Sequence, residues 1–370
     1  MYTLLAFCTI FSFLIANFND KKQKYKLPLI LVYGLPLVLF VLTYALRDGW
    51  CQDFMIYEDV YNHQNLYQGK YEFLFSLLFD FCKQLNFSFN VALFVLSTIF
   101  ILGFFRFTKL FRPYIGLIYT ILFTLTITFI ANNIRFSTAS GFIFASLPFL
   151  QNKKWIPFSL LSVCAVLFHS ATILLIGIIL LFYFFNPFKK LYILIGFYIL
   201  SLFVSAEILG LQFINLFNLI GNAGLSSDLT IMAYIQDEAV TERYFAGERI
   251  ELGAQTLSFF NKATTFIFNI WSLYLGWNLV QKKQKYKLTL YFNLYALSVI
   301  LEHPSMGFEL MLRITTFFKI FASVVWVFII QDLYKRKKFL LTIIFILFII
   351  LNFYRALNFL FSNYNLTYIF

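Results

Sequence analysis

The sequence has 370 residues, of which 61% are hydrophobic and only 12% are charged, and its mean hydropathy is +0.79. A soluble domain of this size needs about a quarter of its residues charged, so the composition excludes a soluble globular protein and indicates lipid as the surrounding solvent. The net charge of +12 does not indicate nucleic-acid binding, because the basic residues form short clusters between apolar runs, as in cytoplasmic loops.

Apolar segments of spanning or near-spanning length follow one another along the whole chain. They lie at about residues 3–18, 27–46, 88–105, 113–131, 134–150, 155–168, 170–185, 190–206, 258–280, 286–302, 310–330 and 338–355. These segments predict an all-α, polytopic integral membrane protein with about 12 transmembrane helices, in a range of about 11 to 14. We expect one membrane domain over residues 1–370.

The basic residues gather in alternate connections between these segments. The clusters lie at residues 21–26, 106–112, 153–154, 189–190, 282–287 and 335–338, and only Asp20 and Asp332 accompany them. If both termini are external, every cluster faces the cytoplasm. The pattern therefore predicts a multi-pass protein of the bacterial cytoplasmic (inner) membrane, surrounded by membrane lipid, with external loops at 47–86 and 207–257.

Two stretches on the outer side are too short for ordinary spans. Residues 72–85 are short and charged, which favours an interfacial or re-entrant helix. Residues 155–185 lie between two basic clusters and must cross outward and back, so each arm is about 22 Å long. This hairpin places His169 at its apex.

Charged and polar residues from distant segments are predicted at the outer ends of the helices, where each charge near lipid needs an explanation. The main candidates are Arg47, Asp53, Tyr57, Glu72, Arg135, His169 and Arg313. Several arginines at one face suit a pyrophosphate, which guanidinium groups bind through charge-assisted hydrogen bonds. Asp53 or His169 would act as the general base toward a hydroxyl. The sequence does not settle the choice, but it favours Asp53, a carboxylate near arginines, with His169 then orienting the acceptor sugar. Lys319 either adds to this site or pairs with a buried acid.

Motifs for metal or nucleotide chemistry do not occur in the sequence. It contains no HExxH, no Walker motif, no glycine-rich nucleotide fingerprint and no DxD dyad in an outer loop. We therefore expect no metal and no cofactor.

Four stretches of the sequence resemble one known group of proteins. They are YALRDGWCQDFMIYEDVYN, YEFLFSLL, NNIRFSTASGFIFASLPFLQNKKWIPFSLLSVCAVLFHSATILL and RITTFFKIF, and in order and spacing they resemble the EpsG-like polysaccharide polymerases, which are related to Wzy proteins. The family pattern maps onto Arg47, Asp53 and Tyr57, then Glu72, then Arg135 and His169, then Arg313. The chain departs from it with Cys51-Gln52 before Asp53, where a glycine is usual, and with two phenylalanines after the late arginine.

The resemblance implies a glycosyltransferase that needs neither metal nor nucleotide. It would join oligosaccharide repeat units carried on polyprenyl pyrophosphate, outside the cytoplasmic membrane, for capsule, exopolysaccharide or O-antigen synthesis. Arg47, Arg135 and Arg313 would hold the pyrophosphate, with Tyr57 and Glu72 binding substrate. A chain-length regulator is a further candidate partner. The alternatives are an O-antigen-type ligase, a membrane acyltransferase that decorates glycans, and a transporter of lipid-linked glycans.

Overall fold

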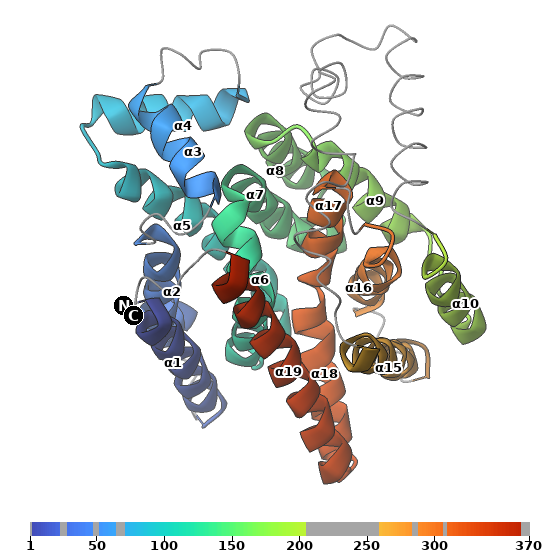
Figure 1. Cartoon of the computed structure of the whole chain (residues 1–370). Coiled ribbons are helices and arrows are strands. Elements are labelled where there is room, and N and C mark those ends of the chain that lie inside the picture. The colour runs from blue at the N-terminus through green and yellow to red at the C-terminus, as the bar shows by residue number, and fades with distance from the viewer. Residues whose placement is uncertain are drawn as a thin grey trace, which may run out of the picture. The chain divides into compact units, whose positions relative to one another are not determined.

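The computed structural model describes residues 2–22, 28–46, 52–63, 71–204, 259–282, 288–305 and 309–363. Within these ranges every element of secondary structure is a helix, which confirms the all-α class (Figure 1). The contacts divide the chain into two compact units, one of Met1–Ile176 with Ile349–Phe370 and one of Gly177–Phe348. The expectation of one membrane domain stays a prediction, and the external loop 207–257 lies outside the described residues.

The first unit contains the helices of the N-terminal half. They are α1 (Tyr2–Lys22), α2 (Leu29–Ala45), α3 (Gln52–Asn62), α4 (Phe73–Gln84), α5 (Phe89–Thr108), α6 (Ile115–Asn132), α7 (Ile134–Gln151) and α8 (Trp155–Phe168). Helix α7 packs between α5 and α8, and α1 packs against α2 and α6. In Figure 1, α3 and α4 lie together at one end of this unit, beyond the end of α2.

The second unit begins within α9 and ends within α19. Its helices are α9 (Thr172–Phe184), α10 (Leu191–Ser201), α15 (Phe259–Trp277), which runs into a π-helical turn (Asn278–Lys282), α16 (Thr289–Leu301), α17 (Glu309–Lys319), α18 (Ala322–Lys335) and α19 (Phe339–Asn363). Helix α16 packs against α10, α15, α17 and α18. Glu302 directly follows α16, and Arg313 and Lys319 belong to α17.

Each predicted apolar segment corresponds to helix in the structure, with two differences of detail. Residues 310–330 were expected as one span, but α17 ends at Lys319 and α18 starts at Ala322. Between them the N–H groups of Ile320 and Phe321 bond to carbonyls three residues back, the tighter pattern of a 3₁₀ turn. The other difference is α3, which lies in a stretch that had been expected as loop.

Close packing of α5 on α7 depends on two glycines that face each other. A Cβ on Gly103 would lie 1.9 Å from the carbonyl oxygen of Gly141, and one on Gly141 would lie 2.6 Å from the Cα of Phe100. Only a residue without a side chain fits at either position, as at close helix crossings in membranes. The crossing holds α7, whose first turn carries Arg135, firmly in the unit.

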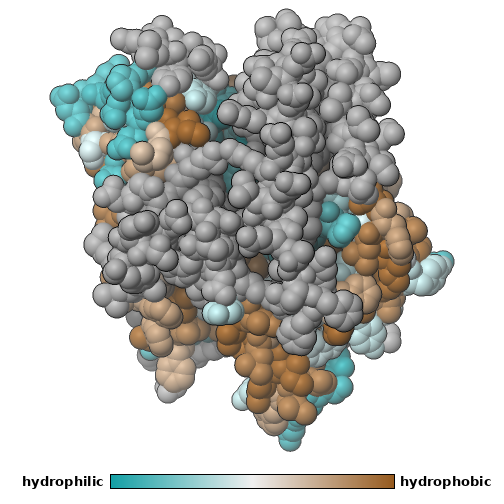
Figure 2. Space-filling view, viewed as in Figure 1, coloured by the Kyte–Doolittle hydropathy of each residue, from teal (hydrophilic) through white to brown (hydrophobic). Residues whose placement is uncertain are grey.

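Apolar side chains on the outside of the helices agree with a lipid environment. Two stretches, Phe89–Phe111 and Met311–Lys335, are long and apolar enough to cross a membrane, and several shorter apolar helices accompany them. On α19, Leu340, Ile343 and Leu347 are exposed. Figure 2 shows hydrophobic surface around the start of this helix, at the lower end of the picture, with hydrophilic residues just beyond it. Such exposed apolar stripes mark a surface that faces lipid or another protein. The count of about 12 spans stays a prediction.

The two acids that accompany the basic clusters are both paired with arginines. Arg112 forms an ion pair with Asp20, whose side chain is fully buried, and Arg336 pairs with Asp332 one helical turn earlier at 3.0 Å. These pairs neutralise acidic charge on the side predicted to be cytoplasmic. The helix α4 that was expected at 72–85 is present at Phe73–Gln84, and its place at the membrane interface stays a prediction.

Candidate functional site

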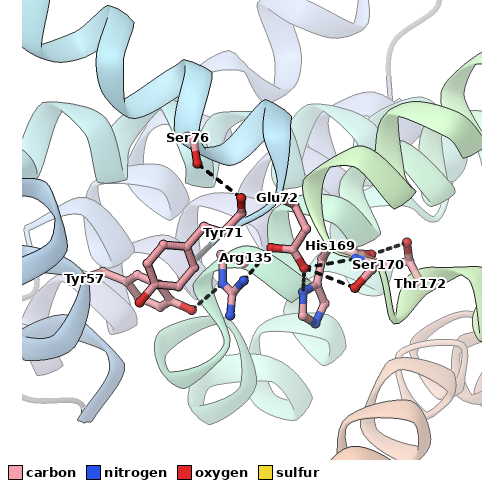
Figure 3. A network of polar contacts seen from close by, with 8 residues as sticks. All are labelled: Tyr57, Tyr71, Glu72, Ser76, Arg135, His169, Ser170 and Thr172. Carbon is pink, nitrogen blue, oxygen red and sulfur yellow. Dashed lines mark hydrogen bonds and ion pairs between the residues drawn. The ribbon is translucent and has the colours of Figure 1, made fainter. Parts of the chain in front are cut away.

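A polar network in the first unit is centred on Glu72. One carboxylate oxygen (Oε2) accepts a hydrogen bond from Nη1 of Arg135 at 2.5 Å, and the other (Oε1) lies 3.0 Å from Nδ1 of His169. The same Oε1 accepts hydrogen bonds from the backbone N–H and the hydroxyl of Ser170, at 3.1 and 3.3 Å. Donors from two distant segments thus converge on one carboxylate, as Figure 3 shows.

Helix ends position the two charged partners. Glu72 lies in extended conformation directly before the first turn of α4, where the positive end of the helix dipole stabilises an anion. Arg135 is the second residue of α7, where the same dipole disfavours a cation. The carboxylate of Glu72 therefore offsets the unfavourable position of Arg135.

His169 lies at the corner between two short helices. Helix α8 ends at Phe168 and α9 begins at Thr172, so the predicted apex position is confirmed. The backbone N–H and the hydroxyl of Thr172 both donate to the carbonyl of His169, at 3.0 and 2.7 Å. The imidazole also packs at a right angle to the ring of Phe136 of α7. These contacts fix the ring where it faces Glu72.

The guanidinium of Arg135 is enclosed by aromatic rings. Its Nε donates to the hydroxyl of Tyr57 at 2.6 Å, and its central carbon lies 4.7 Å from the ring centre of Tyr71, with Tyr57 and Phe75 slightly farther away. The Arg135 side chain is almost completely buried. A planar guanidinium can stack on rings and bond in its own plane at once, which a lysine cannot do.

The charge state of Glu72 decides which nitrogen of the neutral imidazole carries the proton. Burial by itself raises the pKa of Glu72, but the hydrogen bond from His169 and the charge of Arg135 outweigh it and hold the pKa well below the ordinary value of 4.5. An ionised carboxylate only accepts hydrogen bonds, so Nδ1 of His169 is the donor. In the neutral ring Nε2 is then the nitrogen that accepts a proton.

The chain matches the EpsG family over residues 30–370. It belongs to the EpsG family. This family is of the Wzy-like polysaccharide polymerase type, so the resemblance noted in the sequence is confirmed, and the chain is a membrane protein of polysaccharide biosynthesis with a glycosyltransferase-like polymerase function. No curated protein and no solved structure matches the chain.

Of the residues predicted for the EpsG family site, four lie together in the network: Tyr57, Glu72, Arg135 and His169. Arg313 belongs to α17 in the second unit. Arg47 lies outside the described residues, as does the side chain of Asp53. The backbone of Asp53 is in α3, one turn before Tyr57, so both residues occupy the same face of that helix.

Two residues of the network were not predicted from the sequence. Tyr71 supplies the ring nearest the guanidinium of Arg135, and Ser170 supplies two of the donors to Glu72. Each is the sequence neighbour of a predicted residue, Tyr71 of Glu72 and Ser170 of His169. These positions next to candidate residues were the only features of the sequence from which Tyr71 and Ser170 could have been predicted.

Proposed function

We propose that the protein joins oligosaccharide repeat units carried on polyprenyl pyrophosphate, on the outer side of the bacterial cytoplasmic membrane, with His169 as the general base. The observation that carries this proposal is the contact between Nδ1 of His169 and the ionised carboxylate of Glu72. Membership of the EpsG family supports the reaction class. Capsule, exopolysaccharide or O-antigen would be the product.

The proposed chemistry follows from the orientation of the imidazole. The hydroxyl oxygen of the acceptor sugar attacks the anomeric carbon of the donor, and Nε2 of His169 takes the hydroxyl proton. The bond between the anomeric carbon and the pyrophosphate oxygen breaks, and polyprenyl pyrophosphate leaves with the electron pair. Glu72 keeps the ring in the required tautomer and stabilises the imidazolium, the role that an acid plays in hydrolase triads.

Arginines would stabilise the leaving group. A pyrophosphate develops negative charge as the glycosidic bond breaks, and guanidinium groups are well suited to bind it. Arg135 already shares its charge with Glu72, so we propose that it supplies part of the positive potential, with Arg47 and Arg313 as the other candidates. Asp53 remains the alternative base, since its helix also carries Tyr57.

Reconstitution tests the function directly. The purified protein in lipid nanodiscs, given the lipid-linked repeat unit of its own organism, is expected to produce glycans of several repeat units and to release polyprenyl pyrophosphate without added metal or nucleotide. Glycan that is moved to another acceptor without becoming longer would identify a ligase and overturn the proposal.

The proposed orientation has a separate test. Cys51 belongs to the predicted external loop 47–86 and should react with a membrane-impermeant thiol reagent added to intact spheroplasts. A cysteine introduced by Gln284→Cys, in a predicted cytoplasmic cluster, should react only after permeabilisation. The reverse pattern would place the Glu72 network on the wrong side of the membrane for this reaction.

A further inference from the structure

A second polar cluster lies within the second unit, formed by one residue from each of four chain segments. Asn269 of α15 donates through Nδ2 to the hydroxyl of Tyr198 in α10 and to Oε2 of Glu302, each at 3.3 Å. Glu302 directly follows α16, and its Oε1 accepts a hydrogen bond from Nζ of Lys319 at the end of α17. Of the two possibilities that the sequence left open for Lys319, the structure shows pairing with an acid, which is partly buried.

The cluster retains hydrogen-bonding capacity that its internal bonds do not use. An ammonium group has three donors, and among the described residues Lys319 donates only to Glu302. The side-chain oxygen of Asn269 accepts no hydrogen bond from the described residues, and the hydroxyl of Tyr198 donates none. The Lys319 side chain is 37% exposed and that of Glu302 26%. The unused donors and acceptors of the cluster are therefore partly accessible to a ligand.

The balance of charge indicates what kind of ligand fits. Lys319 and Glu302 together carry no net charge, so a phosphate that approached Lys319 would also meet the carboxylate of Glu302 at close range. An uncharged ligand with several hydroxyl groups avoids this repulsion and can both donate and accept. A saccharide ring has this chemistry.

An aromatic surface adjoins the polar groups. The rings of Tyr198 and Phe266 stack with their centres 5.8 Å apart, and Phe266 is partly exposed. Aromatic rings present a negative face, against which the C–H face of a sugar can pack while its hydroxyls reach the polar side. Binding sites commonly combine apolar walls with a few polar groups that fix orientation.

The depth of Lys319 is compatible with a ligand from the external solution. The helical path from Lys319 to Lys335 covers roughly 24 Å at about 1.5 Å per residue, and the hydrocarbon core of a bilayer is about 30 Å thick. If the cluster at 335–338 is cytoplasmic, as predicted, Lys319 lies near the outer boundary of the membrane. There a charged side chain is less costly than at the bilayer centre.

We propose that Tyr198, Asn269, Glu302 and Lys319 form a saccharide subsite that binds the hydroxyl groups of the repeat unit. This proposal rests on the proposed function, because the repeat unit is the saccharide that the proposed reaction would bring to this protein. The saccharide could belong to the growing acceptor chain or to the lipid-linked donor. Both have the same chemistry, and the two arms of the experiment distinguish them.

The test removes the charges as a pair. Glu302→Gln/Lys319→Met leaves no unpaired charge, so a merely structural ion pair should be replaced without loss of thermal stability or binding. We expect the variant to keep its melting temperature but to bind saccharide at least about tenfold more weakly, since charged hydrogen bonds to the ligand are lost. Asp332→Asn/Arg336→Gln removes another ion pair of this unit and should bind as the wild type does. If Glu302→Gln/Lys319→Met does not fold, Asn269→Ala provides the same comparison.

Binding is measured by calorimetry on protein in nanodiscs with three probes. Weaker binding of lipid-free repeat units, prepared by cleaving the organism's own polymer, identifies the acceptor chain, and weaker binding of the lipid-linked unit alone identifies the donor. Unchanged binding of both saccharides, or a loss confined to inorganic pyrophosphate, overturns the subsite. Polymerisation is measured separately, so a protein that binds saccharide at this cluster but forms no polymer would contradict the proposed function and not the subsite.

Discussion

Two buried ion pairs in the first unit have the same chemistry but different surroundings. Arg112 donates from Nε to both oxygens of Asp20 at 3.1 Å, and its Nη2 adds a further bond. The pair of Arg135 and Glu72 also joins a guanidinium to a carboxylate. Glu72, however, divides its oxygens among an arginine, a histidine and a serine. In the first pair, both carboxylate oxygens of Asp20 bond to Arg112. In the second, Glu72 also bonds to the imidazole of His169.

The difference suggests how to separate stability from chemistry. A carboxylate such as that of Asp20, with both oxygens bonded to one arginine, can neutralise charge and join two segments. Among the described residues, that carboxylate bonds to no third group and so orients none. Glu72 sets both the orientation and the tautomer of His169, and perturbed groups of this kind are enriched at functional sites. Changes at Asp20 should therefore affect stability alone, whereas changes around Glu72 should also affect the rate per folded molecule.

The largest effect is expected from His169→Ala. Loss of a general base typically lowers a rate by about 10²–10⁴-fold, so polymer should disappear while the amount of folded protein and the binding of lipid-linked substrate persist. His63→Ala is the matched control, because His63 is exposed and, among the described residues, its side chain bonds only to Asp59, one turn earlier in α3. The measurement is polymer and accumulated repeat unit per folded protein. Full-length polymer from His169→Ala, with none from Asp53→Asn, would transfer the role of base to Asp53.

Removal of Asp20 should act on stability. Asp20→Ala leaves the partly exposed charge of Arg112 without its carboxylate, which costs at most about 3–5 kcal/mol, the range for a fully buried pair. The yield of folded protein and its melting temperature in detergent should fall, and the rate per folded molecule should not. Asp20→Asn/Arg112→Gln should recover much of the stability. A variant that stays folded but does not polymerise would show that the contrast between the two pairs is wrong.

Arg135→Lys should have an intermediate effect. It keeps the charge but loses the planar contacts to Tyr57, Tyr71 and Glu72, which should cost about 1–3 kcal/mol, or about 5- to 150-fold in rate. Arg106→Lys is the control, since Arg106 also lies over a ring, that of Phe149, but in a predicted cytoplasmic cluster. Normal polymerisation by Arg135→Lys would exclude a specific role for its guanidinium.

The smallest effect is a dependence on pH. Because the folded pKa of Glu72 lies below its ordinary value of 4.5, its charge stabilises the protein fully above that value and loses this effect as the pH falls toward the folded pKa. The difference in melting temperature between wild type and Glu72→Gln should therefore persist from about pH 8 to about pH 5 and shrink below it. A difference that vanishes already near neutral pH would mean that Glu72 is not held ionised.

Prediction from sequence succeeded where the signal was local. The apolar runs identified the helices, and the spacing of the basic clusters placed His169 between two short arms, as in the structure. Helix α3 was missed because its composition is polar, although Phe54, Tyr57 and Tyr61 recur at helical spacing and are buried on one face. Its signal was the periodicity of the aromatic residues and not their hydrophobicity.

The sequence by itself determined the all-α class, the membrane environment and the identity of the candidate residues, because hydrophobicity, charge and helical period are properties of neighbouring residues. Only the tertiary structure decided which of these residues meet. Glu72 is 63 positions from Arg135 and 97 from His169, and no local pattern encodes such pairings. They depend on how α4, α7 and α8 pack, and that packing places Glu72 where it orients His169, the proposed base.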